Sequence, residues 1–428
     1  MSQNYKFETL CLHAGQEPDP TTTARGVAVH RTSSYVFKST EHAANLFGLK
    51  ELGNIYTRIM NPTQDVLEQR VAALEGGAAA LALASGTAAI HYSIINICSA
   101  GDEIVSANNL YGGTYTMFDN ILPQFGIRTK FADARDPQSF DSAITDKTRA
   151  IFIETIGNPL LDFTDIGAIS EIAQKHHLPL IVDATFTTPF LLRSFDHGAD
   201  IVINSLTKWM GGHGTGIGGI VIDSGKFDWT DPKFKLYNEP DPSYHGLRYA
   251  HDLGDLNPVA FIMRMRLVPL RNLGACISPD NSWIFLQGLE TLALRIQRHC
   301  ENAMSVAGFL KTHPKVSWVR YPGLEEDPSY PAASKSLKNG FGAMVVFGIE
   351  GGLEAGKKFV DSLQLFSHLA NVGDAKSLVI HPSSTTHSQL SEEQQRAGGL
   401  TPDLVRLSVG LEHIDDIVGD LEQAFAKV

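Results

Sequence analysis

The stretch Ser205–Gly219, S-L-T-K-W-M-G-G-H-G-T-G-I-G-G, places a lysine just after an apolar run and follows it with many glycines. Its last part, Gly214–Gly219, matches the G-x-G-x-x-G pattern of dinucleotide-binding loops. Such a loop must open a helix. Here the apolar run Gly219–Asp223 predicts a strand instead, so we expect the match to be accidental. Glycines between two strands indicate a tight turn against a bulky planar group.

The composition is typical of a globular enzyme that acts on small molecules. The chain has 428 residues, of which 43% are hydrophobic and 19% charged, and its net charge is -12. That charge argues against a nucleic-acid partner, and no stretch approaches the roughly 18 apolar residues of a membrane span. The N-terminus lacks a signal-peptide pattern, and the four cysteines are scattered. We expect a cytoplasmic protein with neither a disulfide framework nor a metal site.

Short apolar runs alternate with helical patterns after an irregular N-terminal arm, residues 1–60. Asn61 is a predicted N-cap, followed by Pro62 and a helix that ends at Gly76. The alternation predicts an α/β fold whose mostly parallel sheet is covered on both faces. The predicted strands are Ala80–Ala84, Glu103–Ala107, Thr129–Ala132, Arg149–Glu154, Leu178–Asp183, Ile201–Ser205 and Gly219–Asp223. We expect a large domain at 61–282, with an insertion at the domain junction near 226–282, and a C-terminal domain at 283–428.

Lys208 lies just past the end of a predicted strand, where open α/β sheets bind their ligands. Asp183 ends the preceding predicted strand and would lie at the same edge of the sheet. An exposed lysine in a loop and a helix-capping aspartate are the simpler interpretations. Together, however, the two residues are what pyridoxal phosphate chemistry requires. The lysine forms the Schiff base, and the acid keeps the pyridine nitrogen protonated.

A phosphate site is predicted where Ser85, Gly86 and Thr87 follow a strand and open a helix. Unpaired N–H groups at a helix N-terminus, with the helix dipole behind them, bind anions. Ser205 and Thr207 can add hydroxyl donors from beside the lysine. A simple cap with a tight turn remains the alternative for Ser85 and Gly86.

Eight short motifs spread along the chain occur together in one enzyme family. They are Y-T-R-I-M-N-P-T (Tyr56–Thr63), A-S-G-T-A-A (Ala84–Ala89), Y-G-G-T (Tyr111–Thr114), E-T-I-G-N-P (Glu154–Pro159), V-D-A-T (Val182–Thr185), S-L-T-K (Ser205–Lys208), H-P-S-S-T-T-H (His381–His387) and V-R-L-S-V-G-L-E (Val405–Glu412). By these motifs the chain resembles the cystathionine γ-synthase family, the Cys/Met-metabolism branch of the fold-type-I pyridoxal phosphate enzymes, over nearly its whole length. That resemblance implies an aspartate aminotransferase-like large domain and a smaller α+β C-terminal domain.

The resemblance implies a role for each matching residue in binding the cofactor. Lys208, Asp183 and Tyr111 would form the catalytic set, in which Tyr111 stacks on the cofactor ring. Asn158 would bind the ring hydroxyl. Gly86, Thr87, Ser205 and Thr207 would hold the phosphate. A buried core tyrosine and a turn-forming asparagine are the alternatives for Tyr111 and Asn158.

Tyr56 and Arg58 would reach the phosphate of a neighbouring subunit, which would explain the irregular arm. The resemblance thus implies a homo-oligomer, at least a dimer and usually a tetramer formed as a dimer of dimers. A surface tyrosine and arginine in a loop are the alternative. The substrate-binding set would be Arg406, Asn371 and Tyr56. Arg406 lies in an apolar strand pattern and suits a carboxylate, although an edge-strand ion pair explains it equally well.

Three features indicate which reaction within the family is expected. Gly113 stands where methionine γ-lyases have a cysteine. Lys376 replaces the glutamate that would meet the distal amino group of cystathionine, although its side chain could face solvent. The 226–282 insertion resembles that of O-acetylhomoserine sulfhydrylases. His381 and His387 are expected in a loop over the site, without metal.

We therefore expect a transferase of methionine biosynthesis. It would convert O-acetylhomoserine and sulfide, or methanethiol, to homocysteine, or methionine, and acetate. The alternatives on the same scaffold are a cystathionine γ-synthase, a γ-lyase or an O-succinylhomoserine sulfhydrylase. A nicotinamide-dependent oxidoreductase is disfavoured because no helix follows the glycines.

Overall fold

The structure, a computed structural model, describes residues 5–385 and 399–428. Its larger sheet has seven strands in the order β1-β7-β6-β5-β4-β2-β3. Only β7 runs antiparallel to its neighbours, so the predicted mostly parallel sheet is confirmed. The strands are β1 (Ala79–Leu83), β2 (Glu103–Ala107), β3 (Arg128–Ala132), β4 (Thr148–Glu154), β5 (Leu180–Asp183), β6 (Ile201–Ser205) and β7 (Gly219–Asp223).

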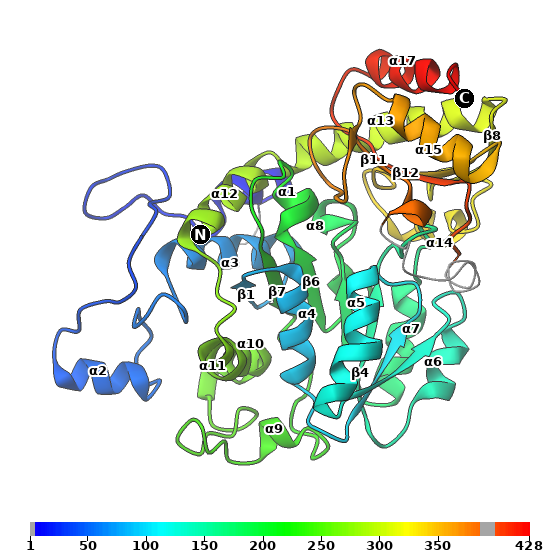
Figure 1. Cartoon of the computed structure of the whole chain (residues 1–428). Coiled ribbons are helices and arrows are strands. Elements are labelled where there is room, and N and C mark those ends of the chain that lie inside the picture. The colour runs from blue at the N-terminus through cyan, green and yellow to red at the C-terminus, as the bar shows by residue number, and fades with distance from the viewer. Residues whose placement is uncertain (1–4, 386–398) are drawn as a thin grey trace.

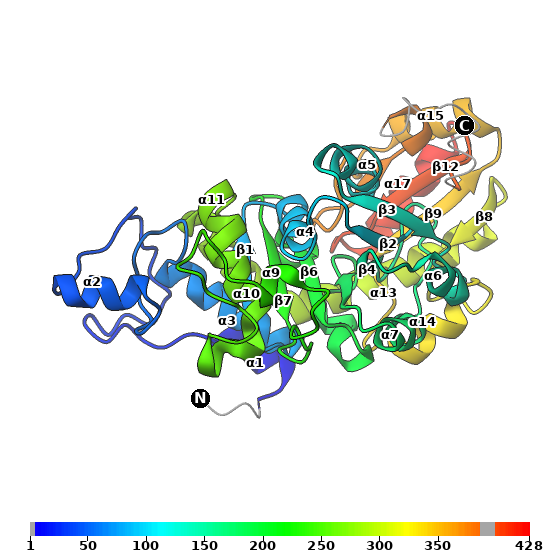
Figure 2. The ribbon, with the colours of Figure 1, turned by 90° about the horizontal axis from the view of Figure 1, so that it is seen from below.

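Helices cover both faces of this sheet, as a doubly wound fold requires (Figures 1 and 2). On one face lie α4 (Gly86–Ile95) and α5 (Gly112–Thr116), and on the other α3 (Pro62–Glu75), α6 (Pro137–Ala143) and α7 (Ile166–Lys175). The start of α3 is as predicted, because Asn61 accepts a hydrogen bond from the N–H of Thr63 and Pro62 takes the first turn. Gly76 ends α3 in the left-handed region, at φ 79°.

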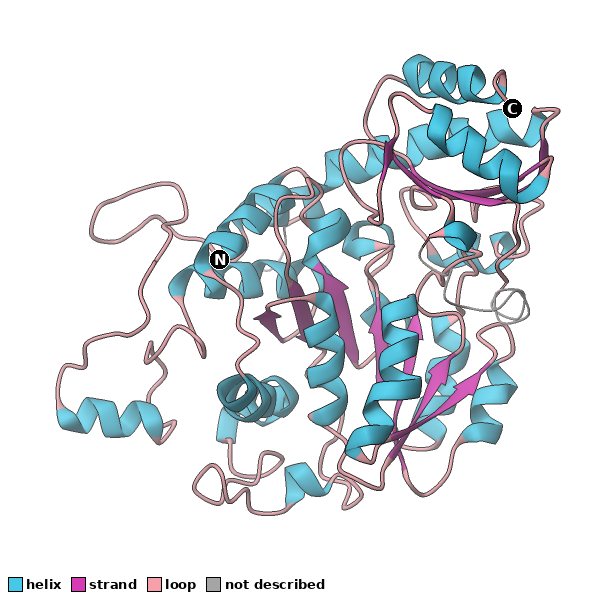
Figure 3. Cartoon of the chain, in the orientation of Figure 1, coloured by secondary structure: helices cyan, strands magenta, loops and turns pink. Residues whose placement is uncertain are grey.

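A second sheet of five strands lies beyond the first, in the order β10-β11-β12-β9-β8. Figure 3 shows both sheets and the helices around them. Three helices pack on the second sheet or beside it, namely α13 (Leu292–Thr312), α15 (Gly352–Ser362) and α17 (Ile414–Phe425). Its strands are β8 (Val316–Arg320), β9 (Met344–Ile349), β10 (Ser367–His368), β11 (Leu378–Ile380) and β12 (Leu404–Ser408).

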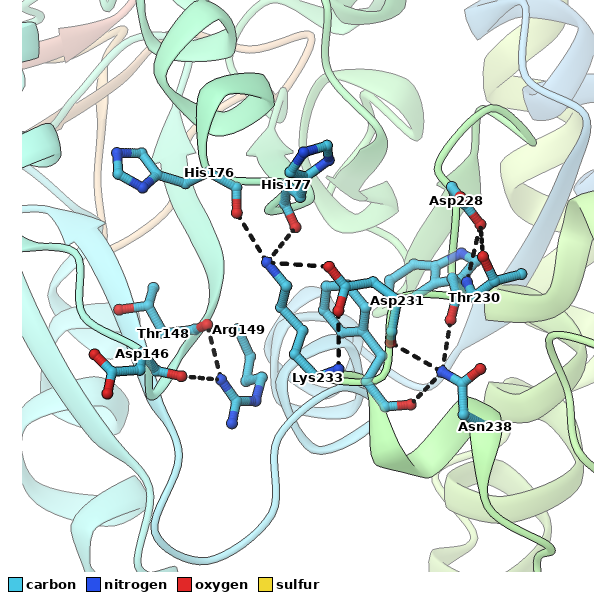
Figure 4. Close-up of polar contacts among 12 residues, drawn as sticks. Asp146, Thr148, Arg149, His176, His177, Asp228, Thr230, Asp231, Lys233 and Asn238 are labelled. Atoms are coloured by element: carbon cyan, nitrogen blue, oxygen red, sulfur yellow. Dashed lines mark hydrogen bonds and ion pairs between the residues drawn. The ribbon is translucent and has the colours of Figure 1, made fainter.

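The insertion lies against the large sheet rather than at the junction with the second sheet. Its helix α10 (Ala260–Met265) contacts β7 and β1, and α9 (Lys235–Asn238) lies nearby. Lys233 Nζ donates to the carbonyls of His176 and His177, at 2.9 and 3.2 Å (Figure 4). These carbonyls follow the end of α7, where a cation is favourable. Only α12 (Pro279–Glu290) leads on toward the second sheet.

The N-terminal arm contains two short helices that the sequence pattern did not predict. Helix α1 (Phe7–His13) packs against α3, α12 and α13. Helix α2 (Thr40–Phe47) lies at the end of an extended segment that projects from the body of the chain (Figures 1 and 2). Among the described residues, no helix combines the length and apolar character needed to cross a membrane.

Candidate functional site

The site lies at the carboxyl edge of the large sheet, where three neighbouring parallel strands end. Glu154 ends β4, Asp183 ends β5 and Ser205 ends β6. Glu154 and Asp183 are paired in register across the two strands. Ligands of open α/β sheets bind at this edge, so the sheet brings the predicted strand-end residues together.

Lys208 follows β6 in a short, wide helical turn, Leu206–Met210. Its own backbone is not helical, with φ -93° and ψ -130°. Its Nζ donates to Asn371 Oδ1 at 2.5 Å, so the structure brings together two predicted site residues from distant parts of the chain. Burial, with a smaller contribution from the cationic Arg406, lowers the pKa of Lys208 to about 8.

Asp183 is held by Thr185, a residue of the V-D-A-T motif to which the sequence assigned no role. Thr185 donates to Asp183 Oδ1 through its N–H, at 2.9 Å, and through its hydroxyl, at 2.6 Å. The same hydroxyl accepts from the N–H of Ser205 at 2.8 Å. Thr185 thus connects the ends of β5 and β6. Burial raises the pKa of Asp183 to about 6.

Glu154 is a buried acid at this edge, beside Asp183, that sequence reasoning did not single out. Its Oε1 accepts from the N–H of Tyr111 at 2.8 Å. Burial and the neighbouring carboxylate of Asp183 raise the pKa of Glu154 well above its usual range. A glutamate ending an apolar strand beside the strand of Asp183 was the available signal.

Tyr111 is 55% exposed, so the interpretation as a core residue is wrong. Its ring lies over Gly113, because a Cβ built at Gly113 would be 2.6 Å from Tyr111 Cε1. A side chain at position 113 would therefore displace this ring. The tyrosine is fixed through its backbone by Glu154, while its ring remains open to a ligand.

Helix α4 begins at a narrow glycine cradle, formed where the backbone of Gly86 approaches Ser205 closely. Ser85 caps the helix by accepting from the N–H of Ala88, so the capping interpretation is also correct. The first-turn N–H groups of Gly86 and Thr87 have no carbonyl partner within a helix. A Cβ at Gly86 would lie 2.7 Å from Ser205 Cβ, so the backbone comes close to Ser205 only because this residue is glycine.

Thr207 and the glycine loop make contacts that the sequence pattern did not reveal. The Thr207 hydroxyl donates to the Gly218 carbonyl and accepts from its N–H, at 3.2 and 3.1 Å. The planar group against the loop is Phe285 of α12, since a Cβ at Gly218 would lie 2.4 Å from its ring. The loop leads into β7 and no helix begins there, as expected.

Arg406 lies within β12, between β11 and β9, so it is not on an edge strand. It is 9% exposed, and its Nη1 donates to Asn158 Oδ1 at 3.3 Å. In the part of the chain that the structure describes, it forms no ion pair with a carboxylate. Burial lowers the pKa of Arg406 to about 10, which leaves it charged at neutral pH. A buried cation with a neutral partner suits an anionic ligand.

The remaining predicted residues lie apart from this group. Arg58 Nη1 donates to the carbonyl of Arg271 at 2.8 Å, and its guanidinium lies 5.2 Å from the centre of the Tyr56 ring. Within the described residues, no contact joins either side chain to Lys208. Lys376 is exposed. His387 falls outside the described residues.

His381 is buried and bonds to Ser384 Oγ and to the carbonyl of Pro402. In the described ranges, 5–385 and 399–428, no cluster of three potential metal ligands occurs.

These residues fit pyridoxal phosphate. The lysine and the carboxylate lie at adjacent strand ends, and the glycine cradle leaves helix N–H groups unpaired within the helix. The fold and the site together define this protein as a fold-type-I pyridoxal phosphate enzyme. A family described as Cys/Met metabolism PLP-dependent enzyme matches residues 8–426, and the chain belongs to that family.

Several relatives match over nearly their full length. O-acetyl-L-homoserine sulfhydrylase of Leptospira meyeri is 56% identical, over 100% of this chain and 98% of that protein. Homocysteine synthase of Schizosaccharomyces pombe is 51% identical, over 98% and 97%.

Two crystal structures are also similar. One is described as a putative O-acetylhomoserine (thiol)-lyase from Campylobacter jejuni and contains N'-pyridoxyl-lysine-5'-monophosphate. It has a TM-score of 0.95 and 42% identity, over 99% of this chain and 100% of that one. The other, metB from Corynebacterium glutamicum, has a TM-score of 0.85 and 32% identity, over 100% and 99%.

Proposed function

We propose that this enzyme converts O-acetylhomoserine and sulfide to homocysteine and acetate, as a transferase of methionine biosynthesis. The Cγ–O bond to acetate breaks and a Cγ–S bond forms; methanethiol in place of sulfide would give methionine. The observation that carries the proposal is the position of Lys208 beside Asn371, close enough to Arg406 for that cation to lower its pKa. The full-length relatives named for this activity support it.

We assign the cofactor contacts as follows. Lys208 carries the cofactor, Asp183 faces its ring nitrogen and the exposed ring of Tyr111 covers its face. Asn158 accepts a hydrogen bond from Arg406 and is assigned to the ring hydroxyl of the cofactor. When bound, pyridoxal phosphate supplies an electron sink for the carbon that loses a proton. The phosphate is assigned to Gly86, Thr87, Ser205 and Thr207.

Lys208 has the properties of a proton carrier at its Nζ. A pKa of about 8 leaves an appreciable fraction of the amine neutral near neutral pH, so it can accept a proton and return it. Asn371 Oδ1 accepts one N–H of this amine and orients it. Arg406 is assigned to the substrate α-carboxylate, which would hold the α-carbon of the substrate near Lys208.

Gly113 favours substitution over elimination among the reactions of this scaffold. A Cβ at this position would be 2.6 Å from Tyr111 Cε1, so the cysteine found at this place in methionine γ-lyases would displace the ring from its present position. Lys376 adds less to this argument than we expected, because its side chain is exposed.

The active form in this proposal is a cytoplasmic homo-oligomer, a tetramer formed as a dimer of dimers. Tyr56 and Arg58 lie in the segment between α2 and α3, and the ring of Tyr56 is exposed. In their own chain they contact one another and Arg271 rather than the lysine. We assign them to the phosphate and substrate of a second copy.

The product distribution tests this function. Purified protein with pyridoxal phosphate and O-acetylhomoserine is assayed with and without sulfide, and homocysteine is measured against 2-oxobutanoate. We expect homocysteine only with sulfide, little oxo acid and no activity in Lys208→Ala. Equal oxo acid formation without sulfide would identify a lyase instead. O-succinylhomoserine and methanethiol, tested in parallel, report the preferred leaving group and nucleophile.

A further inference from the structure

One face of helix α13 contacts both the turn Leu206–Met210, which holds Lys208 and is called the lysine turn below, and the end of β12, the strand that holds Arg406. Arg295, His299 and Asn302 are spaced by four and three residues, so they share this face. Arg295 bonds to the turn that holds Lys208. His299 Nδ1 bonds to the carbonyl of Val409 at 2.7 Å, and Asn302 donates to the carbonyl of Gly410 at 2.9 Å. Both carbonyls follow β12 directly.

Arg295 makes the contacts to the lysine turn. Its Nη1 donates to the carbonyl of Trp209 at 2.9 Å, and its Nη2 donates to that of Met210 at 3.0 Å. Nη2 also donates to the carbonyl of Gly288 at 2.7 Å, and Nε to Thr291 Oγ1 at 3.3 Å. The first two acceptors are the residues directly after Lys208.

The charge of Arg295 is unusual for a packing residue. The side chain is 5% exposed, and all its acceptors are neutral. Across the described ranges it forms no ion pair with a carboxylate. Burying an unpaired cation is costly, and an apolar residue of similar size would usually pack at lower cost. The carbonyl dipoles at the end of a helical turn are what offset that cost here.

The turn itself needs support, because Lys208 interrupts it with a non-helical backbone. The segment between β10 and β11 approaches the turn closely, since a Cβ at Gly373 would lie 3.1 Å from Lys208 Cα. Arg295 also fills the space at Gly212, where a Cβ would lie 1.9 Å from Nη1. The lysine turn is therefore held between two elements.

We propose that Arg295 is a positioning residue that holds the Lys208 turn in its non-helical conformation through the carbonyls of Trp209 and Met210. The inference rests on the proposed role of Lys208. It adds that α13 sets the separation between that lysine and Arg406, because the same helix face also binds the end of β12.

Arg295→Met is the principal test, and Arg193→Met is its matched control. Arg193 also donates to backbone carbonyls, those of Leu74 and Ala73, but at the end of α3. The first readout is hydrogen exchange of the holoenzyme at the N–H groups of Gly211 and Gly212, which bond to the carbonyls of Leu206 and Lys208. The second is the dissociation constant of pyridoxal phosphate.

We expect Arg295→Met to speed exchange at these two amides by about tenfold and to weaken cofactor binding by a similar factor, as removal of a hydrogen bond to a charged group does. In turnover, kcat should fall while KM for O-acetylhomoserine changes little, since Arg406 is untouched. Arg193→Met should leave both amides and the cofactor affinity unchanged. Equal effects of the two variants would show that Arg295 has only a structural role, which would overturn the proposal.

Arg295→Lys serves if the methionine variant does not fold. It keeps the charge but loses the paired donors, so exchange at Gly212 should rise by about threefold. Wild-type exchange in that variant would contradict the proposal. Hydrogen exchange is measured without turnover, so a turn loosened by Arg295→Met together with an active Lys208→Ala would reject the assigned role of Lys208 alone.

Discussion

At the scale of single residues, the site combines a half-buried cation, Lys208, with a buried one, Arg406. Lys208 and Arg406 repel one another, and burial disfavours the charge of both. The lysine, whose ordinary pKa is lower, yields its proton more readily, while the arginine stays charged. One residue is thereby available to exchange protons and the other to bind a carboxylate, which is the division of roles that an amino-acid substrate requires.

Replacing Arg406 with lysine separates these roles. The variant retains a cation near Lys208 but loses the planar pair of donors, so we expect KM for O-acetylhomoserine to rise by about 10- to 100-fold. The pH dependence of kcat should change little. Steady-state kinetics at saturating sulfide measures both quantities.

Arg149→Lys is the matched control, because Arg149 pairs with Asp102 at the opposite end of β4. It should leave KM unchanged. An Arg406→Lys enzyme with an unaltered KM would show that the substrate carboxylate binds elsewhere.

At the scale of elements, α3 meets β6 behind the site through a buried acid. Glu75 Oε1 accepts from Asn204 Nδ2 at 3.0 Å, and both side chains are fully buried. Burial raises the pKa of Glu75 from 4.5 to about 8. The unfolded chain loses this proton above about pH 4.5 and the folded chain near pH 8. The stabilising contribution is therefore complete at low pH and is lost as the pH rises toward 8.

Glu75→Gln should remove this pH dependence, because glutamine resembles the protonated acid. Relative to wild type, we expect a higher unfolding free energy at pH 9, by up to about 4 kcal/mol, and a much smaller difference at pH 5. Urea unfolding of both proteins at the two pH values measures it. Glu354→Gln, at an exposed acid of α15, should behave as wild type. Parallel pH profiles for wild type and Glu75→Gln would contradict this explanation.

The sequence could predict the strands of the large sheet but not the contacts that distant elements make with them. The continuous apolar runs located all seven strands of the large sheet, and therefore the edge where Asp183 and Lys208 lie. Local patterns could not reveal Phe285 against the glycines or Arg295 beneath the lysine turn, because those contacts form only when a distant helix packs there. Glu154 and Thr185 were visible in motifs, but their roles depend on how neighbouring strands align.

At the scale of the whole molecule, the arm has a surface that a single chain leaves uncovered. Val36 is 97% exposed and Leu52 67% exposed, and the two residues flank α2 in the sequence. Helix α2 lies on the segment that projects from the body of the chain (Figure 2). Arg58 Nε is buried without a hydrogen-bond partner in the described part of the chain. Apolar side chains on an extended arm favour a contact with another copy. The central claim is therefore that a site built around Lys208 is completed by the arm of a second copy.

Co-expression of two inactive variants, Lys208→Ala and Arg58→Ala, tests that claim most directly. Each variant alone should be nearly inactive. In a mixed dimer, one site combines an intact Lys208 with an intact arm from the other chain, so random pairing should restore about a quarter of wild-type homocysteine formation. A mixture as inactive as its components, or activity in Lys208→Ala alone, would contradict the account.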